Sequence, residues 1–175
     1  MHTYSRTKRK HDLLIGMLIF VCISVLTAGL VFAIRFSPDI MDRNQVAGVP
    51  ADLPTENGYT AYSAAGVATV SLCCVPSYDG KNADVYLTNH AENQALVKAE
   101  FYSVKTVDNG TGGEVVLPDQ LIGETGYIRP GSYVRQVRLK NLPKGENSKI
   151  MIKICTMLED SGRSNGFFYI RTTIS

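Results

Sequence analysis

Few side chains in this sequence combine the types and spacing that enzymatic chemistry requires. Of the three histidines, His2 and His11 precede a long apolar segment, and only His90 follows it, in the turn sequence 89–93 (NHAEN). Serine catalysis needs a histidine base, yet the sequence contains no Gly-x-Ser-x-Gly elbow, no His-Glu-x-x-His helix and no Ser-x-x-Lys set of the β-lactamase kind. His90 is therefore interpreted as a solvent-exposed loop residue, and the chain is predicted not to be an enzyme.

Carboxylates are the other groups that could perform acid–base chemistry. Four of them lie in predicted loops, where a solvated charge is the ordinary state: Asp79, Asp84, Glu92 and Asp108. A hydrolase that pairs two such acids across a cleft stays an alternative hypothesis, because carboxylates pair in space rather than in sequence. The stretch 79–84 lacks the spacing and terminal Glu of an EF-hand loop. No metal and no cofactor are predicted.

The cysteines could form a disulfide. Cys73, Cys74 and Cys155 lie on predicted strands, and strand alternation turns Cys73 and Cys155 outward and Cys74 inward. A Cys73–Cys155 bridge is one hypothesis, provided that the two strands are neighbours and the compartment is oxidising. Unbridged thiols are the other hypothesis, and the favoured one. No Cys-x-x-Cys pair is present, so thiol–disulfide catalysis has no support.

One element assigns a compartment to each part of the chain. Residues 13–34 (LLIGMLIFVCISVLTAGLVFAI) carry no charge, and four Lys/Arg residues precede them. Such a segment reaches roughly 33 Å as a helix, which is enough to cross a hydrocarbon core of about 30 Å. The positive-inside rule then predicts a cytoplasmic tail (residues 1–12), a single-pass signal anchor (13–34) in the cell membrane, and an extracytoplasmic C-terminal domain. A cleaved signal peptide is the alternative, and it exports the same residues.

The exported part divides into a linker and a β-domain. Residues 35–62 contain three prolines without sustained periodicity, which predicts a linker or stalk. Residues 63–175 contain short runs of alternating apolar residues between turn signals, which predicts antiparallel strands over 67–75, 84–88, 95–104, 114–117, 132–140, 149–158 and 167–174. Residues 36–175 hold 13 Lys/Arg and 15 Asp/Glu. This near-neutral balance argues against nucleic-acid binding.

One segment is similar to a known class of domains. Residues 127–139 (YIRPGSYVRQVRL) place a Pro-Gly turn before an alternating strand, Asn89 ends an earlier strand, and Leu-Pro-Lys-Gly follows at 142–145. Together these features resemble bacterial immunoglobulin-like β-sandwich ectodomains of small signal-anchored proteins of Gram-positive bacteria, over roughly residues 66–175. The resemblance implies an all-β, antiparallel immunoglobulin-like sandwich in a bacterial envelope. It implies no activity. The Trp and the widely spaced Cys pair of antibody-type domains are missing.

The remaining candidates for function lie on the surface. Tyrosines suit interfaces because they combine apolar area with a hydroxyl group. A candidate binding surface is predicted from five strand residues: Tyr86, Tyr102, Tyr133, Arg135 and Arg138. We expect a non-catalytic, membrane-anchored interaction or structural protein of the envelope, an accessory part of a surface or transfer apparatus that contacts a protein partner. A cell-wall glycan-binding module is the alternative, and it would need these tyrosines in line on one sheet face.

Overall fold

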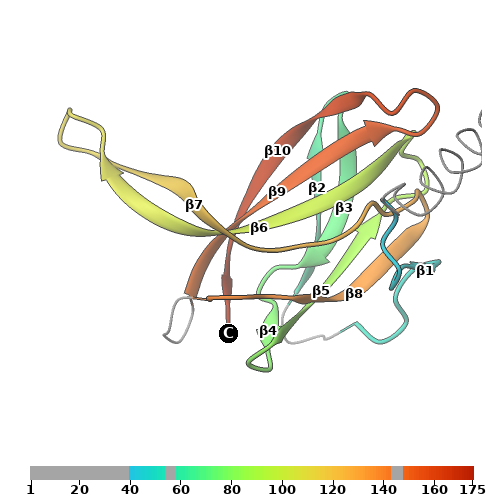
Figure 1. The fold of residues 1–175 in the computed structure, drawn as a ribbon, viewed down its shortest axis with the longest axis horizontal. Helices are drawn as coiled ribbons and strands as arrows, with labels where there is room; N and C mark the ends of the chain where they lie inside the picture. The colour runs from blue at the N-terminus through green and yellow to red at the C-terminus, as the bar shows by residue number, and fades with distance from the viewer. Residues whose placement is uncertain (1–39, 54–57, 143–147) are drawn as a thin grey trace, which may run out of the picture. The chain divides into compact units, whose positions relative to one another are not determined.

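The computed structural model describes residues 40–53, 58–142 and 148–175. In these residues the chain forms strands and no helix (Figure 1). The strands are β1 (Val46–Ala47), β2 (Tyr59–Ala64), β3 (Ala68–Cys73), β4 (Ser77–Tyr78), β5 (Asn82–Asn89), β6 (Ala95–Asp108), β7 (Glu114–Glu124), β8 (Ser132–Arg138), β9 (Ser148–Leu158) and β10 (Ser164–Ile174). This all-β content confirms the predicted class.

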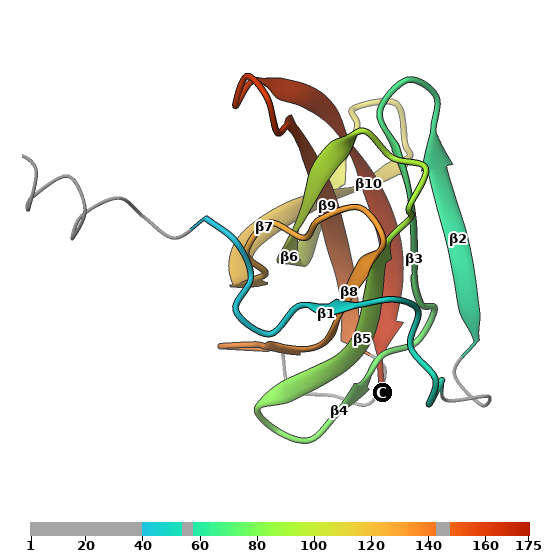
Figure 2. The ribbon, with the colours of Figure 1, turned by 90° about the vertical axis from the view of Figure 1, so that its right-hand side faces the viewer.

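The strands form two antiparallel sheets, an arrangement compatible with a β-sandwich. The first sheet has the order β1-β8-β5-β3-β2, with β4 beside β5, and the second has the order β10-β9-β6-β7. In Figure 2, β2 forms one edge of the first sheet. Strands that follow one another in the chain and belong to the same sheet pair in antiparallel fashion, as the short links between the predicted strands require.

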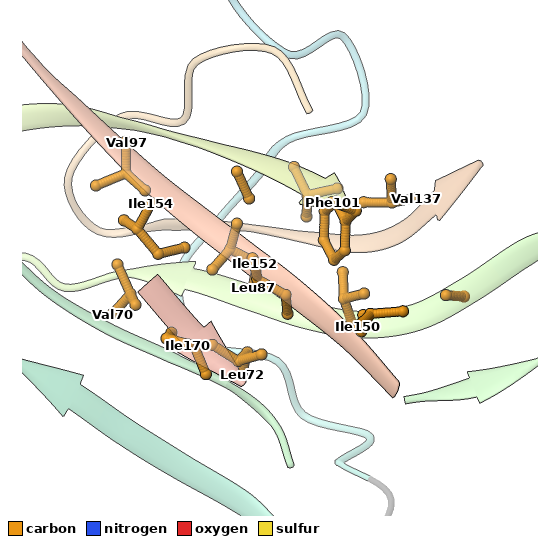
Figure 3. Packing of buried hydrophobic residues seen from close by; sticks show 14 of the residues in the cluster. Val70, Leu72, Leu87, Val97, Phe101, Val137, Ile150, Ile152, Ile154 and Ile170 are labelled. Atoms are coloured by element: carbon orange, nitrogen blue, oxygen red, sulfur yellow. The ribbon is translucent and has the colours of Figure 1, made fainter. Parts of the chain in front are cut away.

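The core lies where the apolar faces of the two sheets meet. Strand alternation places Ile150, Ile152 and Ile154 of β9 in it, and Lys149 and Lys153 on the opposite face, as predicted. Figure 3 shows how side chains from both sheets interdigitate, among them Val70, Leu72, Leu87, Val97, Phe101, Val137 and Ile170. These residues are nearly or fully buried, so their burial supplies the main driving force for folding.

One of the links between the two sheets is a buried amide. Asn89 ends β5 in the first sheet and is fully buried. Its Nδ2 donates to the carbonyl oxygens of Ala95, the first residue of β6 in the second sheet, and of Ile128, at 3.0 and 2.9 Å. Its Oδ1 accepts from Nδ2 of Asn93 at 2.5 Å. All of these polar groups are satisfied inside the protein, which avoids the cost of burying them unpaired.

Much of the segment predicted as a linker belongs to the domain. Met41 forms a bridge with Tyr127, β1 pairs with β8, and β2 begins at Tyr59, inside the range 35–62, and runs past it to Ala64. The linker boundary at residue 62 is therefore wrong. The error has a physical reason: β2 is an edge strand with an irregular pattern of half-buried and exposed residues, and β1 is only two residues long, so neither gives a clear alternation signal.

The residues predicted as the cytoplasmic tail (1–12) and the signal anchor (13–34) lie outside the described part of the structure. Among the residues that are described, no helix has the length and apolar character needed to cross a membrane.

Strands β6 and β7 continue as a long hairpin that projects beyond the sandwich (Figure 1). The sequence predicts that a short strand ends at Pro118, but β7 runs through Pro118 to Glu124. Proline is tolerated there because β7 is an edge strand, where one row of backbone donors faces solvent. Val107 and Val115, paired near the tip, are 41% and 38% exposed.

The sheet-joining amide gives a first prediction. Replacing Asn89 by Ala removes the two hydrogen bonds that its Nδ2 donates to buried carbonyl oxygens and the acceptor of the Asn93 amide, so we expect Asn89→Ala to lower the free energy of unfolding by about 3 kcal/mol. Urea unfolding of the full-length protein in detergent, followed by circular dichroism, measures this. Gln94→Ala changes an exposed residue of the same turn and should stay within about 0.5 kcal/mol of wild type. Equal stability of the two variants would contradict the role of Asn89.

The docked N-terminal segment gives a second prediction. A Cβ at Gly126 would lie 2.5 Å from the backbone nitrogen of Asp42, so Gly126→Ala should push residues 40–48 off the domain. We expect trypsin to cleave after Arg43 at least several times faster in this variant. Gly66→Ala has no atom near its Cβ position, and its φ of 72° confines the strain to the turn between β2 and β3, so it should leave that cleavage rate unchanged. Identical cleavage rates in wild type and Gly126→Ala would contradict the docking.

Candidate interaction surface

The predicted binding residues do not form one surface. Tyr86, Tyr133, Arg135 and Arg138 belong to β5 and β8 of the first sheet, whereas Tyr102 belongs to β6 of the second. Three tyrosines in line on one face, as the glycan hypothesis requires, are therefore not present.

Tyr86 is occupied in an internal contact. The β5–β8 register shifts between Asp84 and Leu87, and Tyr86 in this bulge has a φ of 47°, a left-handed conformation that bulky residues rarely adopt. The side chain is buried, and Cζ of Arg135 lies 5.4 Å from its ring centroid. Nε of Arg135 lies 4.0 Å from Oδ1 of Asp84. The bulge thus directs the ring into a cation–π contact rather than toward a ligand.

A different surface presents exposed aromatic rings. We call it the outer face of the second sheet, and it comprises Lys98, Glu100, Tyr102, Met151, Lys153, Cys155, Phe167, Tyr169 and Arg171. The strand register sets these side chains in cross-strand rows: Arg171 beside Met151 and Tyr102, Tyr169 beside Lys153 and Glu100, and Phe167 beside Cys155 and Lys98. Cross-strand neighbours on one face lie close enough to interact.

Phe167 and Tyr169 are the exposed large hydrophobic side chains of this face, at 56% and 45%. Their ring centroids are 5.7 Å apart and the rings are inclined by 80°, an edge-to-face pair. Nζ of Lys153 lies 5.1 Å from the Phe167 ring centroid. The sequence contained the signal for this pair, because Ile170 and Ile174 face the core and strand alternation then turns residues 167 and 169 outward.

A charge network crosses the middle of the face. Oε2 of Glu100 accepts from the Tyr102 hydroxyl at 2.8 Å and from Nζ of Lys153 at 3.3 Å, and Nζ of Lys98 lies 2.6 Å from Oε2 of Glu124. Burial acts to raise the pKa of Glu100, but hydrogen bonds from Tyr102 and Lys153 and the nearby ammonium charges bring this pKa below its ordinary value of 4.5. Burial, together with the Glu100 carboxylate, raises the pKa of Tyr102 to about 12. Glu100 is thus ionised and Tyr102 neutral over the physiological range.

A groove of about 370 Å³ lies where the hairpin leaves the sandwich. Val104, Val116 and Ile150 give it apolar walls, and Lys149 and Arg171 lie along its edge. Because Arg171 also belongs to the outer face of the second sheet, the groove continues that face toward the projecting hairpin. Among the described residues, no acidic side chain forms an ion pair with Lys149 or Arg171.

The structure does not bring together Cys73 and Cys155, the pair of the disulfide hypothesis. Cys73 lies in β3 of the first sheet and Cys155 in β9 of the second, and both are free thiols. Both side chains point away from the shared core, so the thickness of the sandwich separates them, whereas a disulfide needs Cα atoms within about 7 Å. Burial, then the charge of Asp84, raises the pKa of Cys73 to about 11, which keeps this thiol protonated and unreactive.

The Glu100 network predicts a pH dependence. A carboxyl whose pKa is lower in the folded state stabilises that state above its ordinary pKa, and this stabilisation disappears as the pH falls through the lowered value. We therefore expect the melting temperature of wild type to fall more steeply below about pH 4.5 than that of Glu100→Gln. Glu114→Gln, at the exposed hairpin tip, should keep the wild-type acid response. Parallel melting curves for wild type and Glu100→Gln across this range would contradict the network.

The described residues contain no group of three or more His, Cys, Asp or Glu side chains that could hold a metal ion. Comparison of the chain with protein-family models, with curated proteins and with solved structures found no match.

Proposed function

We propose that this chain is a membrane-anchored interaction protein, whose extracytoplasmic β-domain binds a protein partner through the outer face of the second sheet. One observation carries the proposal: a sheet face that none of the described residues covers presents Phe167 and Tyr169, about half exposed, beside the side chains of Arg171 and Lys153. Aromatic residues, Met and Arg are the residue types enriched at the centres of protein interfaces. Single exposed apolar side chains are ordinary on protein surfaces, whereas a contiguous exposed group of them indicates an interaction site.

The charges of the face indicate the chemistry of the partner. Glu100, Glu124, Lys98 and Lys153 already pair with one another, so covering them leaves no uncompensated charge. Lys149 and Arg171, at the apolar groove, have no acidic partner among the described residues. A complementary partner would therefore place an apolar side chain in the groove and an acidic side chain beside it.

The proposed location follows from the sequence. Residues 13–34 would hold the domain at the outer surface of a membrane, with residues 1–12 in the cytoplasm. Because β1 and the residues before it lie on the domain, the tether would be shorter than the stalk expected from the sequence. Proximity to the membrane suits an accessory part of an envelope assembly.

The immunoglobulin-like character of the sandwich is part of the proposal. The strand orders support it: β10-β9-β6-β7 corresponds to G-F-C-C′, and β8-β5-β3 to E-B-A, in an immunoglobulin-like domain. Strands β1, β2 and β4 would then be additions to that framework.

The geometry favours a protein over a glycan. Sugar rings stack on flat, coplanar aromatic platforms, whereas Phe167 and Tyr169 are inclined by 80°. Tyr102 is only partly exposed and its hydroxyl is engaged by Glu100. An edge-to-face pair backed by a charge network is better suited to packing against protein side chains.

The test compares assemblies in native membranes. Detergent extracts of host cells that express the full-length chain would be separated by native electrophoresis. We expect wild type to migrate in a complex larger than the single chain and Phe167→Ser/Tyr169→Ser to migrate as the single chain, since losing two anchors costs roughly 2 kcal/mol each, or about thirtyfold in affinity per anchor. Val49→Ser removes an apolar side chain that is even more exposed, at 74%, but lies away from this face, and it should leave the complex intact.

Two outcomes would overturn the proposal. If all three proteins migrate alike, the face does not carry the interaction. The second outcome combines two results: no protein complex is seen, and wild type sediments with purified cell-wall glycan whereas the double variant does not. In that case the glycan alternative replaces the protein one.

A further inference from the structure

Three polar side chains from two separate parts of the sequence meet on the outer face of the first sheet. Ser71 Oγ, on β3, lies 2.7 Å from Nε2 of His90, in the turn after β5. Nδ1 of the same imidazole lies 3.7 Å from Oε2 of Glu92. A hydroxyl, an imidazole and a carboxylate in this order form the arrangement by which serine is activated as a nucleophile.

These groups line a cavity rather than open surface. A pocket of about 400 Å³ is lined by Ser71, His90 and Glu92, together with Val49 and Gly48 from the docked N-terminal segment. Ser71 is 5% exposed, whereas the His90 side chain is 32% exposed. The imidazole thus keeps an outer edge in contact with water, and the nearly buried Ser71 hydroxyl is reached through the pocket that it lines.

The floor of the pocket holds a second pair of hydroxyl groups. The Tyr59 hydroxyl donates to Oγ1 of Thr88 at 2.5 Å, and it also lies within hydrogen-bonding reach of Ser71. Burial raises the pKa of Tyr59, so this phenol keeps its proton, which it donates to Thr88. To stabilise negative charge that develops on an oxygen during acyl transfer, the Tyr59 hydroxyl would have to turn from Thr88 toward the pocket.

We propose that Ser71 is an activated nucleophile that hydrolyses small, uncharged acyl esters. In the first step the Ser71 oxygen attacks the ester carbonyl carbon, its proton passes to Nε2 of His90, the carbon–oxygen bond of the ester breaks, and the leaving alcohol takes the proton from His90. Water then attacks the acyl group on Ser71, with His90 again taking and returning the proton. The carboxylic acid leaves, and Ser71 is restored.

The surroundings define the roles of the other residues and the substrate class. Glu92 is a positioning residue: its side chain is 85% exposed and 3.7 Å from Nδ1, longer than a hydrogen bond, so its contribution is small. Val49, Ala91 and two glycines give the pocket small, mostly apolar walls. A short aliphatic acyl group fits such walls, whereas a charged substrate would find only Glu92 and His90 near it.

This inference is independent of the proposed interaction face, because the two sites use opposite sheets. It runs against the expectation from sequence that the chain has no enzymatic activity. Sequence reasoning missed the site because 19 residues separate Ser71 from His90. Only the pairing of β3 with β5 brings them together.

The experiment uses the full-length protein in detergent, treated with diisopropyl fluorophosphate at about pH 8. Attack by Ser71 forms an oxygen–phosphorus bond and releases fluoride, and mass spectrometry of the digested protein locates the adduct. We expect an adduct on Ser71 and hydrolysis of p-nitrophenyl acetate. Ser71→Ala and His90→Gln should each reduce that hydrolysis about 100-fold, and Glu92→Gln only a few-fold. Ser161→Ala, at an exposed turn, should match wild type.

Three results would overturn the inference. The first is a folded protein that gives no adduct on Ser71. The second is hydrolysis that survives Ser71→Ala but not His90→Gln, because it would assign the reaction to the imidazole alone. The third is an adduct on Ser71 that forms equally fast in wild type and His90→Gln, since the serine would then lack activation by its base.

Discussion

The hydrogen bonds of the Asn89 side chain are the constraint on which the rest of the structure depends. This one amide sits at the end of β5 and donates to backbone groups of the segment that builds the second sheet, at Ala95 and Ile128. Ile128 in turn exchanges backbone hydrogen bonds with Val97 of β6. The two sheets are thereby held in one register, with their apolar faces together and their other faces turned outward.

Both functional surfaces depend on that register. In the second sheet, β6 and β9 are the inner strands, so the rows that carry Tyr102, Lys153 and the exposed Phe167 rest on a fixed base. In the first sheet, the turn that follows Asn89 carries His90, whose backbone N–H donates to Thr69 at 3.4 Å, and this contact holds the imidazole over β3. A rigid scaffold that presents side chains from strands and short turns is suited to recognition and to chemistry alike.

The sequence predicted where the strands lie better than it predicted which strands pair with one another. Two-residue alternation correctly assigned the faces of β9, because Ile150, Ile152 and Ile154 alternate with Lys149, Met151 and Lys153. Alternation does not say which sheet a strand joins, so it could not separate Tyr102 from Tyr86 or Cys155 from Cys73. The exposed pair on β10 could have been found, because the inward isoleucines of that strand fix the outward positions of Phe167 and Tyr169. The contact of Ser71 with His90 had no sequence signal, because strand pairing alone creates it.

The most direct measurement of the central claim is site-specific photo-crosslinking of the full-length protein in its own membrane. A benzophenone amino acid would replace Tyr169 on the outer face of the second sheet or, as a control, Val46, which is 49% exposed on β1 of the first sheet. We predict a discrete adduct with another protein from position 169, lost when Phe167 is also changed to Ser, and no such adduct from position 46. Equal adducts from both positions, or none from position 169, would contradict the assignment of this face as the binding surface.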